Sequence, residues 1–272
     1  MNLMKNKKAG YIVTGQWAKK AYQEAQMYGE AIELASSADQ TFSYIPDCSD
    51  LPVSEDADYV YICENETIHG VTWPKLPDTK GHVLVSDQSS MFLSKPCCVT
   101  DYGMIYAGVQ KNVGPAGMVI VIMKEDLIPE EVDPKMPVYL KYATHADTNS
   151  GYNTPNCWSI YCCGLVIRNL LEHGGLEAIY QKNQEKAKII YDFLDNSTLF
   201  RGKVDPEFRS LMNIPFTTGN PDTDADVVAS AVRVGLSNLK GHPSVGGLRA
   251  SVYNAMPIDG ARALVEVLQR YE

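Results

Sequence analysis

The chain has 272 residues, with a formal net charge of -9 at pH 7. Its composition of 45% hydrophobic and 21% charged residues is ordinary for a globular protein and can form one large domain or two smaller ones. The acidic balance and the lack of a Lys/Arg block argue against a nucleic-acid partner, and no apolar run approaches the ~20 residues of a membrane span.

Short apolar runs predict the strands of the first half of the chain. They lie at residues 11–14, 31–35, 59–63, 82–86, 104–107 and 118–123. The runs are nearly continuous instead of alternating, which is typical of strands covered on both faces in a mainly parallel sheet. An amphipathic helix is predicted at 18–28, ending at Gly29.

After Pro134 the pattern changes to longer helices with fewer strands. We predict helices at 160–172, 176–194, 224–234 and 258–271, and strands at 211–217 and 248–253. The chain is therefore expected to form a large α/β domain over residues 1–164 and a smaller α+β domain over residues 165–272.

The seven cysteines are an odd number without the spacing of a metal site. The adjacent pairs Cys97-Cys98 and Cys162-Cys163 suit neither a zinc knuckle nor an easy disulfide. Cys157, Cys162 and Cys163 lie in an apolar stretch and are expected to be small buried hydrophobes. Because the N-terminus also lacks the apolar segment of a signal peptide, we expect a cytoplasmic location.

Lys111 is the first candidate functional residue. It follows the apolar strand at 104–107 and stands in a glycine-rich turn, directly before the next apolar strand. A partly desolvated lysine loses its proton readily and can form a Schiff base with a carbonyl. Taken alone, the residue can also be read as a solvated lysine of a turn.

Asp87 closes the preceding strand and is the second candidate. A carboxylate and then a lysine at successive strand ends of an α/β sheet match the needs of pyridoxal phosphate. The carboxylate would pair with the pyridinium nitrogen, so that the ring can accept the electrons of a carbanion. The alternative interpretation is an Asx turn with Ser89 or Ser90.

Trp17 and Thr67 follow two other predicted strands. The flat face of Trp17 suits stacking on a pyridine ring, although a hydrophobic staple at the start of a helix is the alternative. The hydroxyl of Thr67 would hold the phenolic oxygen of the cofactor, or it belongs to a simple turn. His69 is interpreted as a loop histidine with a local hydrogen bond and is not predicted to be catalytic.

Five motifs carry a resemblance to a known family. They are TGQWAKKA (14–21), NETIHG (65–70), DQSS (87–90), YAGVQKNVGPAG (106–117) and NLKGHPSVGGLRASVYNA (238–255). The set resembles the phosphoserine aminotransferases, which are fold-type-I, pyridoxal-phosphate-dependent transaminases, and it covers nearly the whole chain. The resemblance implies a mainly parallel, seven-stranded-type sheet in the large domain, here lacking its N-terminal part, and a homodimer.

The resemblance also implies roles for the candidate residues. Lys111 would form the Schiff base with the cofactor and move the proton between Cα and C4′. Asp87 would pair with the pyridinium, Trp17 would stack on the ring, and Thr67 would bond its O3′. Gln110 would reach the cofactor phosphate.

Four further residues enter through the resemblance alone. Asn153 and Thr154 look like the residues that the family lends across its dimer interface to the cofactor phosphate. His242 and Arg249 look like substrate-binding residues, with Arg249 on the α-carboxylate. A guanidinium fork suits a carboxylate better than an ammonium does.

The implied reaction transfers an amino group between glutamate and 3-phosphohydroxypyruvate, as in serine biosynthesis. Two departures from the family leave alternatives open. Pro243 stands where the family generally has an arginine that helps to hold the substrate phosphate, and the family's N-terminal segment, with its phosphate cradle, is not in this sequence. The alternatives are a catalytically impaired, truncated relative, or an aminotransferase for another oxo acid, such as the four-carbon phosphorylated oxo acid of vitamin B6 synthesis. Loss of that segment is also expected to expose sheet edges and apolar surface.

Overall fold

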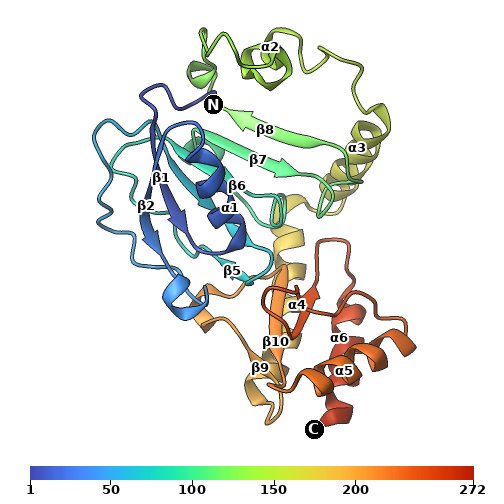
Figure 1. The fold of residues 1–272 in the computed structure, drawn as a ribbon. Coiled ribbons are helices and arrows are strands. Elements are labelled where there is room, and N and C mark those ends of the chain that lie inside the picture. The colour runs from blue at the N-terminus through green and yellow to red at the C-terminus, as the bar shows by residue number, and fades with distance from the viewer.

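A six-stranded sheet with the order β2-β1-β3-β6-β7-β8 organises the first half of the chain (Figure 1). The computed structural model describes residues 1–272. The strands are β1 (Lys8–Val13), β2 (Glu30–Ser36), β3 (Val60–Cys63), β6 (Leu84–Asp87), β7 (Met104–Gly108) and β8 (Val119–Met123). All neighbours pair in parallel except β7 and β8, which form an antiparallel hairpin. The predicted, mainly parallel sheet is confirmed, with six strands present.

The burial of successive residues explains why the strand runs are continuously apolar. On β1, Ile12 belongs to one buried apolar cluster, whereas its neighbours Tyr11 and Val13 belong to another. On β3, Ile62 and Tyr61 divide between the same two clusters. Since successive side chains of a strand point to opposite faces, the sheet has a core on each face.

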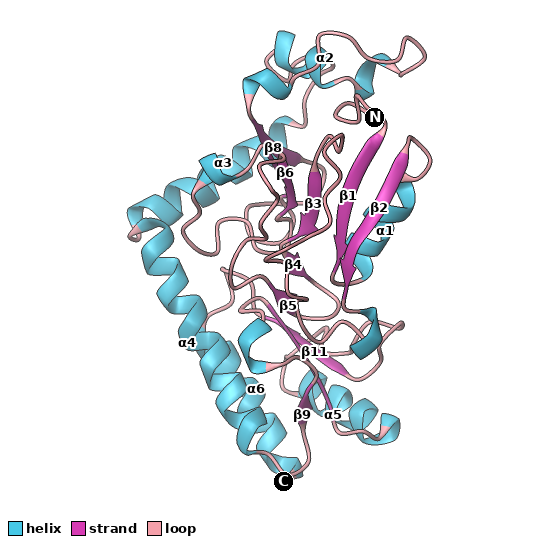
Figure 2. Cartoon of the chain, turned by 90° about the vertical axis from the view of Figure 1, so that its left-hand side faces the viewer, coloured by secondary structure: helices cyan, strands magenta, loops and turns pink.

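Strand β8 differs from this pattern. Its Val119 and Val121 are 58% and 42% exposed, so the prediction of coverage on both faces is wrong for this edge strand. The reason is that only one face is packed: Ile120 and Ile122 contact the core, whereas Val119 and Val121 belong to no apolar cluster. The opposite edge is β2, which lies beside α1 (Gln16–Ala25), as Figure 2 shows.

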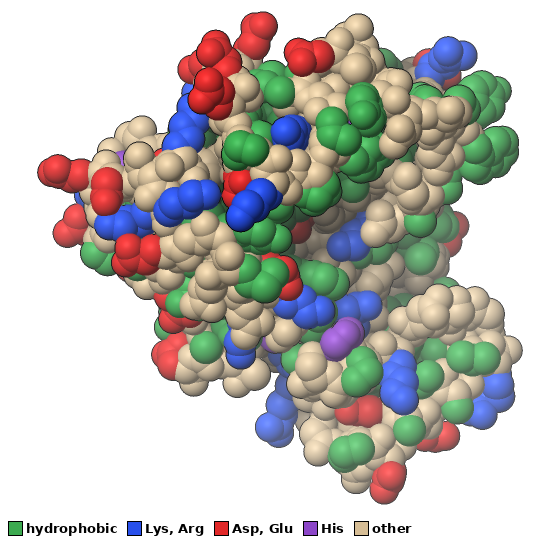
Figure 3. All heavy atoms as spheres, turned by 45° about the horizontal axis from the view of Figure 1, so that its top comes forward, with side chains coloured by type: hydrophobic (Ala, Val, Ile, Leu, Met, Phe, Trp, Pro, Cys, Tyr) green, Lys and Arg blue, Asp and Glu red, His purple; other side chains and the backbone are tan.

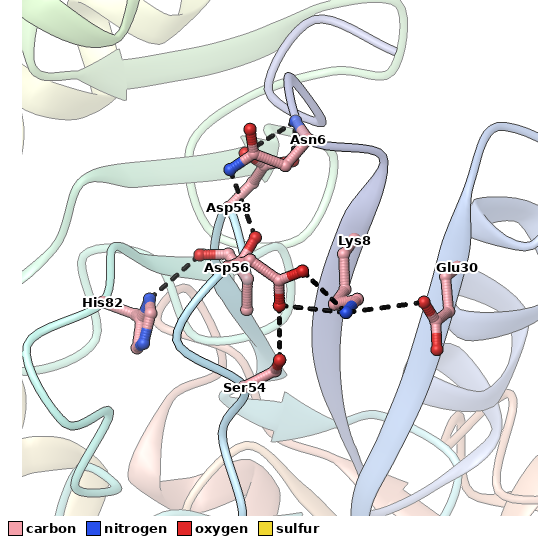
Figure 4. Close-up of polar contacts among 8 residues, drawn as sticks. Asn6, Lys8, Glu30, Ser54, Asp56, Asp58 and His82 are labelled. Carbon is pink, nitrogen blue, oxygen red and sulfur yellow. Dashed lines mark hydrogen bonds and ion pairs between the residues drawn. The ribbon is translucent and has the colours of Figure 1, made fainter.

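Polar contacts fix the entry of the chain into β1 (Figure 4). Lys8 forms ion pairs with Asp56 at 2.7 Å and Glu30 at 3.7 Å. The backbone N–H of Asn6 donates to Asp58 at 2.8 Å. The carboxylates of Asp56 and Glu30 are both more than half exposed, and such ion pairs typically contribute about 0–1 kcal/mol each. Their effect is therefore to fix where β1 lies between its neighbours more than to stabilise the fold.

The second half of the chain contains the longer helices and a small antiparallel sheet. The helices are α2 (Tyr142–Asp147), α3 (Cys157–Glu172), α4 (Gly175–Asn196), α5 (Pro221–Arg233) and α6 (Ile258–Leu268). The small sheet has the order β11-β10-β9, with β9 (Arg201–Gly202), β10 (Asn213–Thr217) and β11 (Leu248–Ser251). A separate two-stranded pair consists of β4 (Asn65–Glu66) and β5 (Val71–Thr72). Single-turn 3-10 helices occupy Ala38–Gln40, Val99–Asp101, Glu125–Leu127, Val138–Leu140, Pro206–Phe208 and Gln269–Tyr271.

A third apolar cluster joins α4, α5 and α6 to the small sheet. Ile190, Phe216 and Leu248 are fully buried in it. The predicted boundary between residues 164 and 165 falls inside α3, whose Cys163 packs in the core of the large sheet. The division into two domains at that point stays a prediction.

Helix α3 contacts the rest of the chain along a narrow stripe. Trp158, Tyr161 and Leu171 are 68%, 62% and 69% exposed. The prediction of buried cysteines is confirmed for Cys163 but wrong for Cys157, which lies on the exposed first turn, and Cys162 is only partly buried. No helix is long and apolar enough to cross a membrane.

Asparagine side chains connect the segment after β6 to the C-terminal half. Asn183 donates to the carbonyl of Ser94 at 2.9 Å, and Asn254 donates to the carbonyl of Leu93 at 2.8 Å. Asn112 accepts from the backbone N–H of Asn254 at 3.0 Å. These bonds fix the position of the C-terminal half relative to the large sheet, beside the tip of β7.

Candidate active site

Lys111 lies at the tip of the β7–β8 hairpin and is half-buried. Its Nζ donates to Thr67 Oγ1 at 3.1 Å and lies 5.9 Å from the centre of the Trp17 ring. Burial lowers the pKa of Lys111, and the nearby Arg249 acts in the same direction, while the charge of Asp87 opposes the shift. The structure thus brings together four predicted residues from separate segments around an amine that deprotonates more easily than a surface lysine.

Asp87 is the last residue of β6, in register with Cys63 of β3 and Tyr106 of β7. One carboxylate oxygen accepts from the backbone N–H of Ser89 at 2.8 Å, so the Asx turn is formed. The same carboxylate is close enough to influence the pKa values of Lys111 and Tyr106. The two interpretations of Asp87 are therefore compatible.

Trp17 belongs to the first turn of α1, and Glu66 holds that turn. Glu66 accepts from the backbone N–H groups of Trp17 at 3.1 Å and Ala18 at 2.8 Å. Trp17 is 39% exposed, and the ammonium of Lys20 lies 4.9 Å from the centre of its ring. The ring is thus partly exposed and lies near Lys111.

Glu66 was not predicted as a site residue, although it stands in the NETIHG motif next to Thr67. Its side chain is fully buried, and burial raises its pKa to about 7. The two N–H groups of α1 act against this shift, because they stabilise the ionised carboxylate. Its place in the motif was the available signal, but a carboxylate that caps a helix distant in sequence has no local pattern.

Arg249 extends from β11 toward the same turn. One guanidinium nitrogen donates to the carbonyl of Thr67 at 3.4 Å, whereas the buried Nε has no partner. A buried donor without an acceptor is costly, typically about 1–3 kcal/mol, and a bound carboxylate would remove that cost. The predicted residue therefore lies beside the amine with unused hydrogen-bonding capacity.

His242 lies in the exposed loop before β11, where its Nδ1 is 2.7 Å from Ser244 Oγ. Its charge helps to lower the pKa of His69. His69 itself is buried, and its Nδ1 accepts from the backbone N–H of Gln16 at 3.4 Å. The hydrogen bond expected for His69 is thus present, but it is not local, because its partner Gln16 lies 53 residues away in sequence.

The three remaining predicted residues are not in contact with this cluster. Gln110 is exposed at the hairpin tip, with its side chain folded over Gly108. Asn153 and Thr154 are exposed in the segment between α2 and α3 and make no hydrogen bond. Their predicted roles concern a phosphate group and a second subunit, so they stay predictions.

The fold and the cluster around Lys111 define an aminotransferase. The family model "Aminotransferase class-V" matches residues 2–264, and the chain belongs to this family of pyridoxal-phosphate enzymes. A phosphoserine aminotransferase of Bacillus cereus is 48% identical over 273 residues, which is 100% of this chain and 76% of the relative. Within class V, the chain therefore belongs with the phosphoserine aminotransferases.

Solved structures agree with this assignment. A phosphoserine aminotransferase studied for radiation damage of its Schiff base has a TM-score of 0.97 at 42% identity, over 100% of this chain and 76% of that chain. The pyridoxal-phosphate-bound phosphoserine aminotransferase of Trichomonas vaginalis has a TM-score of 0.93 at 36% identity, over 98% of this chain and 77% of that chain. The α/β fold with a mainly parallel sheet is thereby confirmed.

Proposed function

We propose that the protein transfers an amino group between glutamate and 3-phosphohydroxypyruvate, with phosphoserine and 2-oxoglutarate as products. The names of the relatives support this reaction. The observation that carries the proposal is the Lys111 amine, which has a lowered pKa and a hydroxyl partner and lies near a carboxylate and an indole face.

The residues present fit pyridoxal phosphate. The cofactor, when bound, supplies an aldehyde that reacts with amines and a ring that accepts electrons. Lys111 offers the amine, and its only side-chain hydrogen bond is to Thr67 Oγ1, at 3.1 Å. Asp87 offers a carboxylate for a ring nitrogen, and the exposed face of Trp17 offers a stacking surface.

The reaction requires a base that moves a proton at the substrate Cα. Lys111 suits this task, because burial lowers the pKa of its amine and the hydrogen bond to Thr67 orients it. Glu66 contributes indirectly: by holding the first turn of α1, it positions Trp17. Arg249 would bind the α-carboxylate, because its unpartnered Nε then gains an acceptor.

A homodimer is part of this proposal. Asn153 and Thr154 are exposed immediately before α3, whose outer face is apolar. A second subunit that covers α3 would receive these two side chains near its own cofactor phosphate, where Gln110 is also expected to bind. The seven free cysteines support a cytoplasmic location, because a reducing compartment keeps thiols free.

Covalent labelling of Lys111 tests the function. The full chain is loaded with pyridoxal phosphate, reduced with borohydride and digested, and the labelled peptide is identified by mass spectrometry. We expect the label on Lys111, its loss in Lys111→Ala, and its retention in Lys124→Ala, a matched exposed lysine just after β8.

A spectrum recorded before and after glutamate completes the test. Addition of glutamate should change the absorbance of the bound cofactor in the original chain and in Lys124→Ala. A label that survives in Lys111→Ala, or a spectrum that does not respond to glutamate, contradicts the proposed function.

A further inference from the structure

The loop that carries His242 has a rigid shape but lacks the expected second cation. The N–H of Gly241 donates to the carbonyl of Gly247 at 2.8 Å, and the N–H of Gly246 donates to the carbonyl of His242 at 2.9 Å. Pro243 is exposed in this loop and has neither a charge nor an N–H group. An anion at this loop therefore needs a cation from another segment.

Lys203 provides a positive charge at this loop. It follows β9, and its Nζ donates to the carbonyls of Val245 at 2.8 Å and Gly246 at 3.2 Å. These bonds use two of the three N–H groups of the ammonium. Burial lowers the pKa of Lys203, with Asp224 opposing the shift, yet no carboxylate forms an ion pair with it. Lys203 is a partly buried cation with a free donor.

Pro215 lies between Lys203 and the segment of His69: the N–H of Lys203 donates to the carbonyl of Pro215 at 3.2 Å, and Gly70, which follows His69, packs against the Pro215 ring. Burial is the main reason why the pKa of His69 falls to about 4, and the charges of His242 and Lys203 lower it further. Because Nδ1 of His69 accepts from a backbone N–H, the neutral ring carries its proton on Nε2 and can donate there. Figure 3 shows Lys, Arg and His side chains around the hollow between the two parts of the molecule.

This group of bases adjoins the amine. His69 is two residues from Thr67, which accepts hydrogen bonds from both Lys111 and Arg249. A substrate with its α-carboxylate on Arg249 would extend its other end toward the bases. Three neighbouring bases without a carboxylate partner favour a dianionic group, since charge-assisted bonds from several donors are the strong ones.

We propose that Lys203 is a substrate-binding residue that, together with His69 and His242, receives the distal phosphate of the substrate and supplies the cation that Pro243 cannot. This inference rests on the proposed function and assigns its specificity for a phosphorylated substrate to a residue outside the five family motifs. A purely structural role for Lys203, as a tie between β9 and the loop, is the competing explanation.

Charge-selective variants separate the two explanations. Lys203→Gln keeps a donor for the loop carbonyls but removes the charge, and Lys203→Arg keeps the charge. Lys240→Gln is the matched control, because Lys240 is an exposed lysine of the same loop without an ion pair. The full chain, saturated with pyridoxal phosphate, is titrated calorimetrically with phosphoserine and with inorganic phosphate, and its cofactor absorbance is titrated with glutamate.

We expect Lys203→Gln to weaken phosphoserine binding by about 10-fold or more, since loss of a charged hydrogen bond has this order of effect. Glutamate, whose distal group carries one negative charge instead of two, should be weakened less, and Lys203→Arg and Lys240→Gln should bind phosphoserine within about 3-fold of the original chain. Introducing Pro243→Arg into the Lys203→Gln chain should restore the affinity for phosphoserine.

Equal weakening for phosphoserine and glutamate, or no weakening at all, overturns the assignment of Lys203. If Lys203→Gln does not fold, phosphoserine binding is measured with Lys203→Arg and with Pro243→Arg instead. The inference is contradicted if Lys203→Arg loses phosphoserine binding and Pro243→Arg does not bind phosphoserine more tightly than the original chain. Failure of the proposed function has a different signature, because the cofactor spectrum would then not respond to glutamate even in the original chain.

Discussion

Two buried titratable groups with opposite pKa shifts lie beside the first turn of α1. Burial raises the pKa of Glu66 to about 7 and lowers that of His69 to about 4. Both groups bond to backbone N–H groups at the start of α1. Each group is therefore partly neutral at pH values at which its isolated side chain would be charged. The hydrogen bonds that hold Trp17 and the start of α1 therefore depend on pH through both an acid and a base.

His69 should make stability increase with pH between about 4 and 6.5. In this window the folded chain binds fewer protons at His69 than the unfolded chain, so unfolding becomes less favourable as pH rises and the contribution is lost as pH falls. We expect the difference in free energy of unfolding between the original chain and His69→Gln to shrink as pH falls from 7 to 4.5. The measurement is denaturant unfolding at several pH values.

The exposed His173 is the control for this prediction. Replacing it in the variant His173→Gln should leave the difference in unfolding free energy independent of pH. The opposite effect of Glu66 is present in all three chains and cancels when differences are taken. A His69→Gln difference that is the same at pH 4.5 and pH 7 contradicts the predicted protonation behaviour.

At the scale of the elements, α4 is joined to the end of β11 by a buried ammonium. Lys186 is 1% exposed, and its Nζ donates to the carbonyls of Val252 at 3.0 Å and Tyr253 at 2.7 Å. Burial lowers its pKa to about 8, so desolvation offsets part of what these bonds contribute. The lysine fixes the angle at which the chain leaves β11 toward α6.

Lys186→Met should lower the free energy of unfolding by about 1–3 kcal/mol, because two buried carbonyls lose their donor. Lys188→Met, on the exposed side of the same helix, should change it by less than about 0.5 kcal/mol, since Lys188 pairs only with the solvated Asp192. Urea unfolding followed by circular dichroism compares the two. Equal stabilities of the two variants would show that the Lys186 bonds contribute nothing net.

The elements show what a sequence can predict and where it stops. The strands around Ile12 and Ile62 are predictable because their continuous apolar runs reflect two buried faces. Strand β9 has only two residues, Arg201 and Gly202, and therefore no periodicity that could be detected. Coverage of β8 depends on which segments pack on each face of the sheet, which is a property of the whole fold.

The candidate site divides in the same way. Lys111 was recognisable because strand, lysine and glycine turn are adjacent in sequence. Glu66 and Lys203 act on segments far from them in sequence, α1 and the loop before β11, so their contacts exist only after folding. The sequence therefore predicts the amine and its partners in the motifs, whereas the groups that position them require the structure.

At the scale of the whole molecule, the outer face of α3 is an exposed apolar surface. Trp158, Tyr161, Leu165 and Leu171 are all more than 40% exposed, and the exposed segment with Asn153 and Thr154 leads directly into this helix. Contiguous apolar surface of this kind is typical of an interface. It supports the homodimer that the proposed function requires.

Trp158→Glu should convert the dimer to monomers, because a charge would be buried against a second copy. Val232→Glu is the control, since Val232 on α5 is 58% exposed and lies away from α3. Sedimentation velocity distinguishes the species, and circular dichroism checks that both variants fold. If Trp158→Glu sediments at the same rate as the original chain, α3 is not part of the interface.

The asparagine that follows Lys111 has a mechanical consequence. Asn112 donates to the carbonyl of Phe92 at 3.1 Å and accepts from the N–H of Asn254, 142 residues away in sequence, at 3.0 Å. The side chain that accepts from the backbone after β11 thus belongs to the residue next to Lys111. A rotation of the C-terminal helices against the large sheet must either break this bond or displace Lys111. The position of the Lys111 amine is therefore coupled to the orientation of the two halves of the chain.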